Sequence, residues 1–100
     1  METQPSRIAV IGIIVEDPES VEKLNAILHD YSAYILGRMG IPYREKNMSI
    51  ISIVMDAPAN EISALSGKLG MLPNVSTKTV YSKVTSSAQD TGAPQNGGKP

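Results

Sequence analysis

The chain contains no cysteine, no tryptophan and no phenylalanine, and its 100 residues include one histidine. Without cysteine there is no disulfide framework, no thiolate nucleophile and no cysteine ligand for an iron–sulfur cluster. Nine basic and ten acidic residues leave a net charge of −1. A dedicated nucleic-acid surface normally shows a clustered basic excess, so we expect no direct nucleic-acid binding. The core must be aliphatic.

Targeting and membrane signals are also missing from the sequence. The apolar run at 8–15 is too short to span a bilayer, and its flanks lack the basic region and cleavage site of a signal peptide. We therefore expect a cytoplasmic protein with no membrane association, which the lack of cysteine also suits. Composition predicts a flexible N-terminus at 1–6, one folded domain at 7–83 and a disordered tail at 84–100.

Four segments have the composition of strands. Residues 7–15 and 48–55 are rich in β-branched side chains and apolar on both faces, which is typical of strands buried on both sides. Residues 34–40 contain two glycines and predict a strand with a bend or bulge, followed by a polar connection at 41–47. Residues 75–81 are β-prone but polar and predict a fourth strand.

Two segments have helical periodicity. Apolar side chains recur three and four positions apart after Asp17-Pro18, so we expect a helix capped by Asp17 that runs to residue 31 or 33. Residues 56–60 are expected to open a second helix that ends at Gly70. Its buried stripe is predicted to consist of Ile62, Leu65 and Leu69.

The element order strand, helix, strand, strand, helix, strand predicts an α+β fold, a ferredoxin-like βαββαβ sandwich with two helices on one face of a four-stranded antiparallel sheet. Its spatial order, fourth, first, third, second, places the doubly apolar strands in the centre and the polar or glycine-containing strands at the edges. The uncovered face should still show about half of Ile11, Ile13, Ile51, Ile53 and their neighbours. Monomers rarely expose such a patch, so we predict a homo-oligomer, a dimer or a dimer of dimers, packed through this face or by edge pairing.

Several stretches carry a resemblance to a known family, the iron-only hydrogenase system regulators. The stretches are GIPYREKNMSII at 40–51, ALSGKLG at 64–70, VSTKTV at 75–80, LHDYS at 28–32 and ILGR at 35–38. The resemblance covers roughly residues 8–81. These proteins are similar to ACT domains and to the C-terminal metal-sensing domain of nickel-responsive repressors. Membership implies the ferredoxin-like fold, oligomerisation and a regulatory role. The first strand begins near Arg7, so DNA binding of the nickel-repressor kind is not expected.

The densest group of charges surrounds the connection between the second and third strands. It contains Arg38, Arg44, Glu45 and Lys46. One interpretation is a solvated turn that protects a sheet edge. The other is anion capture, in which Arg38 and Arg44 bind a carboxylate or phosphate bidentately. On this second interpretation the ligand-binding residues are Arg38, Arg44 and Glu45, and copies of the loop could face one another across a subunit interface.

Other groups of residues give weaker indications of a functional site. His29 is typical of a partly exposed helix residue, and a nickel-type site needs several His or Cys ligands, so no metal and no cofactor is expected. The segment Ser66-Gly67-Lys68 resembles the end of a phosphate-binding loop, but Ile62 occupies the position where that motif requires glycine. No nucleophile–base pair with plausible spacing emerges, so we do not expect an enzyme.

The leading hypothesis is a small oligomeric ACT-like regulatory domain that senses a small ligand or a protein partner at a subunit interface. One alternative is a metal-sensing module that uses His29 together with ligands from other subunits. Another is a ferredoxin-like enzyme of the dimeric α+β barrel kind, which would need a polar cavity between sheet and helices.

Overall fold

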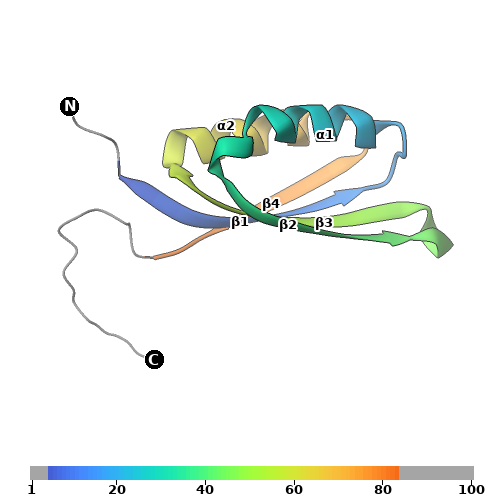
Figure 1. Ribbon diagram of the computed structural model, residues 1–100. Helices are drawn as coiled ribbons and strands as arrows, with labels where there is room; N and C mark the ends of the chain where they lie inside the picture. Colours follow the sequence, from blue (N-terminus) through green and yellow to red (C-terminus); the bar gives the residue numbers. More distant parts are fainter. Residues whose placement is uncertain (1–4, 84–100) are drawn as a thin grey trace, which may run out of the picture.

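Two helices lie side by side on one face of a twisted four-stranded sheet, and no element within residues 5–83 covers the other face (Figure 1). This computed structural model describes residues 5–83, so residues 1–4 and the predicted tail at 84–100 lie outside the described residues. The elements in chain order are β1 (Ser6–Val15), α1 (Ser20–Asp30), the 3-10 turn η1 (Ser32–Tyr34), β2 (Ile35–Tyr43), the 3-10 turn η2 (Arg44–Lys46), β3 (Met48–Pro58), α2 (Ala59–Gly70) and β4 (Val75–Tyr81).

The sheet is antiparallel with the strand order β2-β3-β1-β4, which confirms the predicted α+β, ferredoxin-like arrangement. The central strands β1 and β3 pair along their whole length, from Ser6 opposite Pro58 to Val15 opposite Ser49. Both are rich in isoleucine and valine, whose branched side chains suit a pleated surface packed on both sides. The edge strands are the polar β4 and the glycine-containing β2, as predicted.

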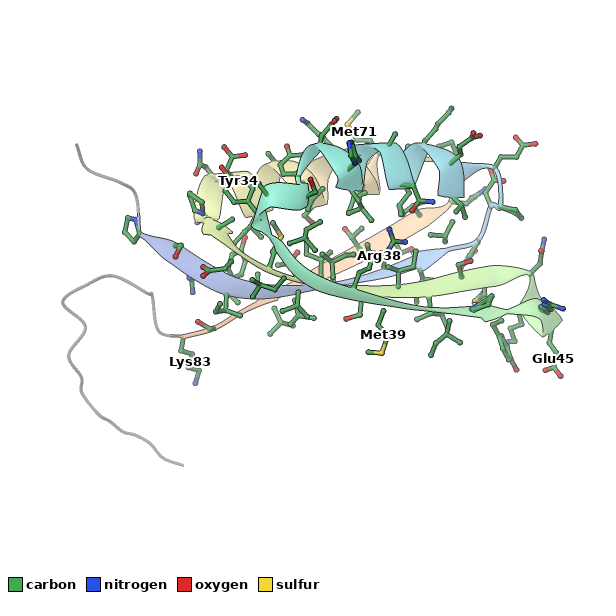
Figure 2. All side chains as sticks on the ribbon, in the orientation of Figure 1. Tyr34, Arg38, Met39, Glu45, Met71 and Lys83 are labelled. Atoms are coloured by element: carbon green, nitrogen blue, oxygen red, sulfur yellow. The ribbon has the colours of Figure 1, made fainter. Side chains whose placement is uncertain are left out.

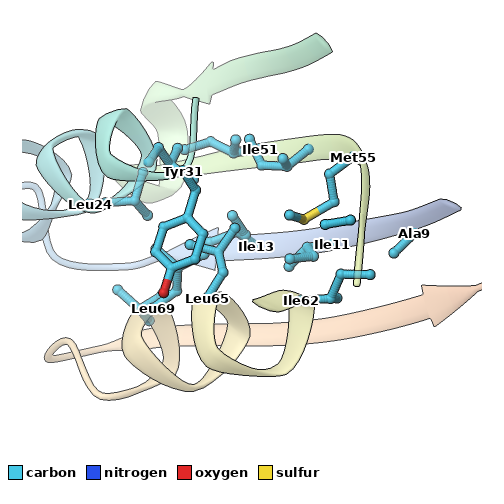
Figure 3. Close-up of a cluster of buried hydrophobic side chains, with 14 of the residues drawn as sticks. Ala9, Ile11, Ile13, Leu24, Tyr31, Ile51, Met55, Ile62, Leu65 and Leu69 are labelled. Carbon is cyan, nitrogen blue, oxygen red and sulfur yellow. The ribbon is translucent and has the colours of Figure 1, made fainter. Parts of the chain in front are cut away.

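The core lies between the sheet and the helices (Figure 3). Alternate residues of β1 and β3 point into it, because successive side chains of a strand lie on opposite faces. The helices close it with side chains three and four positions apart. The largest buried members are Ile11, Ile13, Leu24, Ile53, Met55, Ile62, Leu65 and Leu69. Ser20 is also buried, and its hydroxyl donates a hydrogen bond to the carbonyl oxygen of Pro73 at 2.8 Å.

The hairpin between β2 and β3 is longer than predicted. The expected connection at 41–47 was wrong in its first half, because Ile41 pairs with Ile50 and Tyr43 with Met48 in a continuous ladder. An edge strand bonds to one neighbour, so it tolerates the proline at position 42, and the turn is confined to η2 and Asn47. The predicted irregularity in this strand is confirmed by a register shift between Ile35 and Gly37.

The start of α1 differs from its prediction, and the start of α2 lies within its predicted range. Helix α1 starts at Ser20 rather than Pro18, since the Asp17 carboxylate closes a separate turn by accepting the Glu19 backbone N–H at 3.0 Å. Helix α2 starts at Ala59, inside the predicted opening at 56–60 but near its end, because β3 continues to Pro58 through pairing with β1. The end of α2 at Gly70 and the bounds of β4 are confirmed.

The expected exposure of the central isoleucines was wrong in its choice of face. Ile11, Ile13 and Ile53 are at most 1% exposed beneath the helices, whereas Ile14 and Ile50 are 41% and 42% exposed on the other side. Both sets are apolar, so alternation along the strands could not say which set the helices would cover. The prediction of an apolar uncovered face itself is confirmed.

Candidate functional site

The uncovered side of the sheet, called here the open face, is a continuous apolar surface. Residues directly opposite in an antiparallel ladder point to the same side. Val10 therefore shares this side with its partners Val54 and Val80, and Ile14 shares it with Ile50. Figure 2 shows Met39 of β2 pointing away from the helices on the same side. The more exposed apolar members are Val10, Ile14, Met39, Ile41, Tyr43, Ile50 and Val80.

A hollow of about 510 Å³ lies over the middle of the open face. Gly12, which has no side chain, lines it together with its ladder partners, Ser52 of β3 and Lys78 of β4. A Cβ atom built on Gly12 would meet nothing closer than the carbonyl oxygen of Lys78 at 3.9 Å. Ile14 and Ile50 line the same hollow. The depression can therefore accept an apolar side chain or a small apolar group.

The structure separates the charged residues predicted to bind a ligand. Arg38 lies on the helix side of β2, where its Nη1 donates a hydrogen bond to Oδ1 of Asn25 in α1 at 3.1 Å (Figure 2). Arg44 and Glu45 lie in η2 at the end of the hairpin, and Oε1 of Glu45 accepts the Tyr43 hydroxyl at 2.9 Å. More than about 15 Å of extended chain lies between Arg38 and Arg44. Their roles in ligand binding stay predictions.

A small hollow of about 140 Å³, the hairpin hollow, lies beside Arg44. Asn47 and Ser49 contribute from the hairpin, and Pro18 and Val21 contribute from the start of α1. The fold thus brings the charged turn beside the turn between β1 and α1, which are far apart in the sequence. Its volume suits ordered water or a single small ion.

A larger hollow of about 380 Å³, the α1–β2 hollow, contains Arg38. Asn25, His29 and Ser32 line it from the end of α1 and the turn that follows, and Leu28 and Ile35 form its apolar part. Sequence reasoning considered His29 and Arg38 separately and missed their proximity. The available signal was the spacing of the three polar residues, which places positions 25, 29 and 32 on one side of a helical segment.

Metal ligands and membrane spans were searched for in the described part of the chain. Within residues 5–83, no group of three or more His, Cys, Asp and Glu side chains could hold a metal ion. None of the helices in this range is long and apolar enough to cross a membrane.

The sheet order, the two helices on one face and the apolar open face define a small α+β domain of the ferredoxin-like kind. Residues 7–79 match the family described as TM1266-like, iron-only hydrogenase system regulator, a functional description that is provisional. The chain belongs to this family. It is similar to the solved structure of the uncharacterized protein TM1266 from Thermotoga maritima, with 40% sequence identity and a TM-score of 0.75. The match covers 78% of this chain and 99% of that chain.

None of the curated proteins matches the chain. The family resemblance seen in the hairpin, in α2 and in β4 is confirmed by the family match. The likeness to ACT domains stays a prediction.

Proposed function

We propose that this protein is a regulatory component of an iron-only hydrogenase system, that it works in the cytoplasm as a homo-oligomer, and that it acts by binding rather than by catalysis. Family membership supports the system and the regulatory role. The observation that supports this mode of action is the apolar open face, because a large exposed apolar surface favours association with a partner. The assembly is a dimer, or a dimer of dimers, with the open faces packed together.

The size of the open face supports assembly with a second copy. The exposed fractions of its apolar side chains correspond to roughly 600 Å², at the upper limit of the patches that monomers expose. A standard interface buries about 800 Å² per partner, so this face with its rim is large enough for a stable dimer. At about 25 cal/mol per Å², covering it contributes on the order of 15 kcal/mol per subunit before the costs of association.

The regulatory signal in this proposal is a small ligand or a protein partner bound at the boundary between subunits. Arg38, Arg44 and Glu45 are the candidate contacts, since each presents charge at the edge of the domain rather than in its aliphatic interior. A cytoplasmic regulator of this size needs no resident cofactor to work in this way.

Neither alternative function gains an observation in its favour. A metal-sensing module would have to assemble its ligands from several subunits, because the described residues of one subunit offer no group of three. A dimeric α+β barrel enzyme would need a polar cavity between sheet and helices. That space holds the aliphatic core, including Ile11, Ile53 and Leu65 at 0% exposure.

The first test is sedimentation velocity of the purified full chain over a range of micromolar concentrations. We expect a dimer or tetramer, and a monomer throughout the range would contradict the proposed assembly.

The second test is genetic and uses a host that contains an iron-only hydrogenase. Deleting the gene for this protein should change hydrogenase activity, and the wild-type chain should restore it. Ile50→Lys, which places a charge on the open face, should fail to restore it, whereas Lys23→Gln on the exposed side of α1 should succeed. Unchanged hydrogenase activity after deletion would contradict the regulatory role.

A further inference from the structure

We propose that the α1–β2 hollow is a binding site for a small oxyanion ligand, a molecule that carries a carboxylate or phosphate group. Arg38 is also a candidate ligand contact in the proposed function, but all the groups that line this hollow belong to one subunit, so the inference does not rest on the oligomer. Arg38 and His29 both line the hollow, a combination that no sequence motif indicates.

The guanidinium of Arg38 is held in place while most of its donors stay available. One hydrogen bond, from Nη1 to Oδ1 of Asn25 at 3.1 Å, ties the edge strand β2 to α1 and orients the group. A guanidinium has five N–H donors in a planar fork that matches an oxyanion. Among residues 5–83, no carboxylate forms an ion pair with Arg38, so its charge is not neutralised from within the described chain.

The other lining groups complete a site for an anion. His29 offers a ring N–H in either tautomer, and the hydroxyl of Ser32 can donate as well. The amide of Asn25 accepts from Arg38 through its oxygen, which leaves its NH₂ group free to donate toward the hollow. All four polar groups lining the hollow can therefore donate to the same ligand.

The apolar part of the hollow strengthens this arrangement. Leu28 is 3% exposed, and Ile35 packs against the core, so the polar groups stand beside a low-dielectric wall. Electrostatic attraction is stronger there than in bulk water. The volume of about 380 Å³ falls within the range of small-molecule sites, about 300 to 1,000 Å³. The hollow therefore suits a small molecule with an anionic head and a short apolar part.

The experiment is a titration of ¹⁵N-labelled full-length protein followed by two-dimensional NMR at fixed neutral pH. Sodium sulfate and sodium acetate are the probes, and sodium chloride at matched ionic strength is the reference. We expect saturable shifts of the backbone amides of residues 25, 29, 32 and 38 with sulfate or acetate, and none that saturate with chloride. Sulfate binding would indicate a phosphate ligand, and acetate binding would indicate a carboxylate ligand.

Variants locate the binding. Arg38→Gln should weaken the apparent affinity at least about tenfold, since hydrogen bonds to charged groups contribute the most. Arg38→Lys keeps the charge without the fork and should lose part of the affinity. His29→Gln should weaken binding about threefold. Lys23→Gln is the matched control, because it removes one exposed positive charge from α1 outside the hollow, and it should bind as the wild type does.

The proposal would be overturned by shifts that do not saturate with either probe, or by equal shifts with chloride. An equal loss of affinity in Lys23→Gln and Arg38→Gln would also overturn it, because that result indicates general charge attraction. Arg38 is exposed, and the dispersion of the Arg38→Gln spectrum will show that the variant is folded.

Discussion

The two faces of the sheet are built from the same two central strands and the same residue types, yet they have different surroundings. On the helix side, Ile11 and Ile53 are 0% exposed, whereas Ile14 and Ile50 on the open face remain 41% and 42% exposed. Hydrophobicity alone does not distinguish the two sets. The helices cover one face and bury the odd-numbered side chains of β1, whereas its even-numbered side chains point to the open face. In the proposed function, folding depends on the first set and assembly on the second.

The largest effect should come from truncating the same side chain on each face of β3. Ile53→Ala removes packed atoms from the core and should lower the free energy of unfolding by about 3 to 4 kcal/mol. Ile50→Ala should cost less than about 1.5 kcal/mol, because water already reaches that side chain. Urea denaturation measures both losses, at protein concentrations low enough to dissociate the oligomer. Equal losses would show that the two faces do not differ as described.

A charge on the open face should act on assembly rather than on folding. Ile50→Lys should weaken dimerisation by about 2 to 3 kcal/mol, since a two-fold interface contains the substitution twice and a buried unpaired charge is costly. Sedimentation equilibrium measures the change. Met71→Lys is the matched control, because Met71 is 85% exposed at the end of α2 and lies away from the sheet. If Met71→Lys weakens the dimer as much, the open face is not the interface.

Filling the hollow over Gly12 tests the same face with an apolar side chain instead of a charge. Gly12→Val should fold normally and change subunit stability by less than about 1 kcal/mol, because its Cβ has room and a β-branched residue suits a strand. In the dimer, the added side chain should clash with the partner group that occupies the hollow. Overpacking of this kind should weaken dimerisation by about 1 to 2 kcal/mol. Unchanged or tighter dimerisation would mean that no partner group enters the hollow.

The contrast between the faces also shows how far sequence reasoning could reach. Strand order followed from which segments are apolar on both sides, and the bounds of β4 and the end of α2 followed from local composition. The choice of face did not follow, because Val10 and Ile14 are as apolar as Ile11 and Ile13. The choice of face depends on how the helices pack against the sheet, and the alternation of side chains along a strand carries no information about that packing.

The candidate sites show a similar limit. Arg38 and Arg44 are close in sequence, but an extended strand carries them to different hollows. His29 and Arg38 are farther apart in sequence, and η1 together with the start of β2 brings them to the lining of one hollow. The charge cluster in the sequence therefore grouped residues that the fold separates, and whether any of them binds a ligand stays a prediction.

The smallest expected effect lies on the solvent side of the helix layer, where Lys68 of α2 covers Tyr31. The Lys68 ammonium lies 5.1 Å from the centre of the Tyr31 ring, which is 7% exposed. Hydrogen bonding to Tyr31, and then the charge of that group, raise the pKa of Lys68 above its ordinary value of 10.5. A raised pKa stabilises the folded state wherever the lysine is protonated in both states, and this contribution is lost as the pH rises through the folded-state pKa.

We therefore expect the wild type to have a slightly higher melting temperature than Lys68→Met from neutral pH up to the ordinary lysine pKa. This difference should shrink at higher pH. Thermal unfolding of both proteins across the alkaline range measures it. In a Tyr31→Phe background the ring remains and the hydroxyl is gone, so the pH-dependent part of the difference should shrink to what the charges of Asp30 and Glu61 contribute. If it persists there undiminished, the Tyr31 hydroxyl is not its source, and the charges of Asp30 and Glu61 raise the pKa of Lys68 instead.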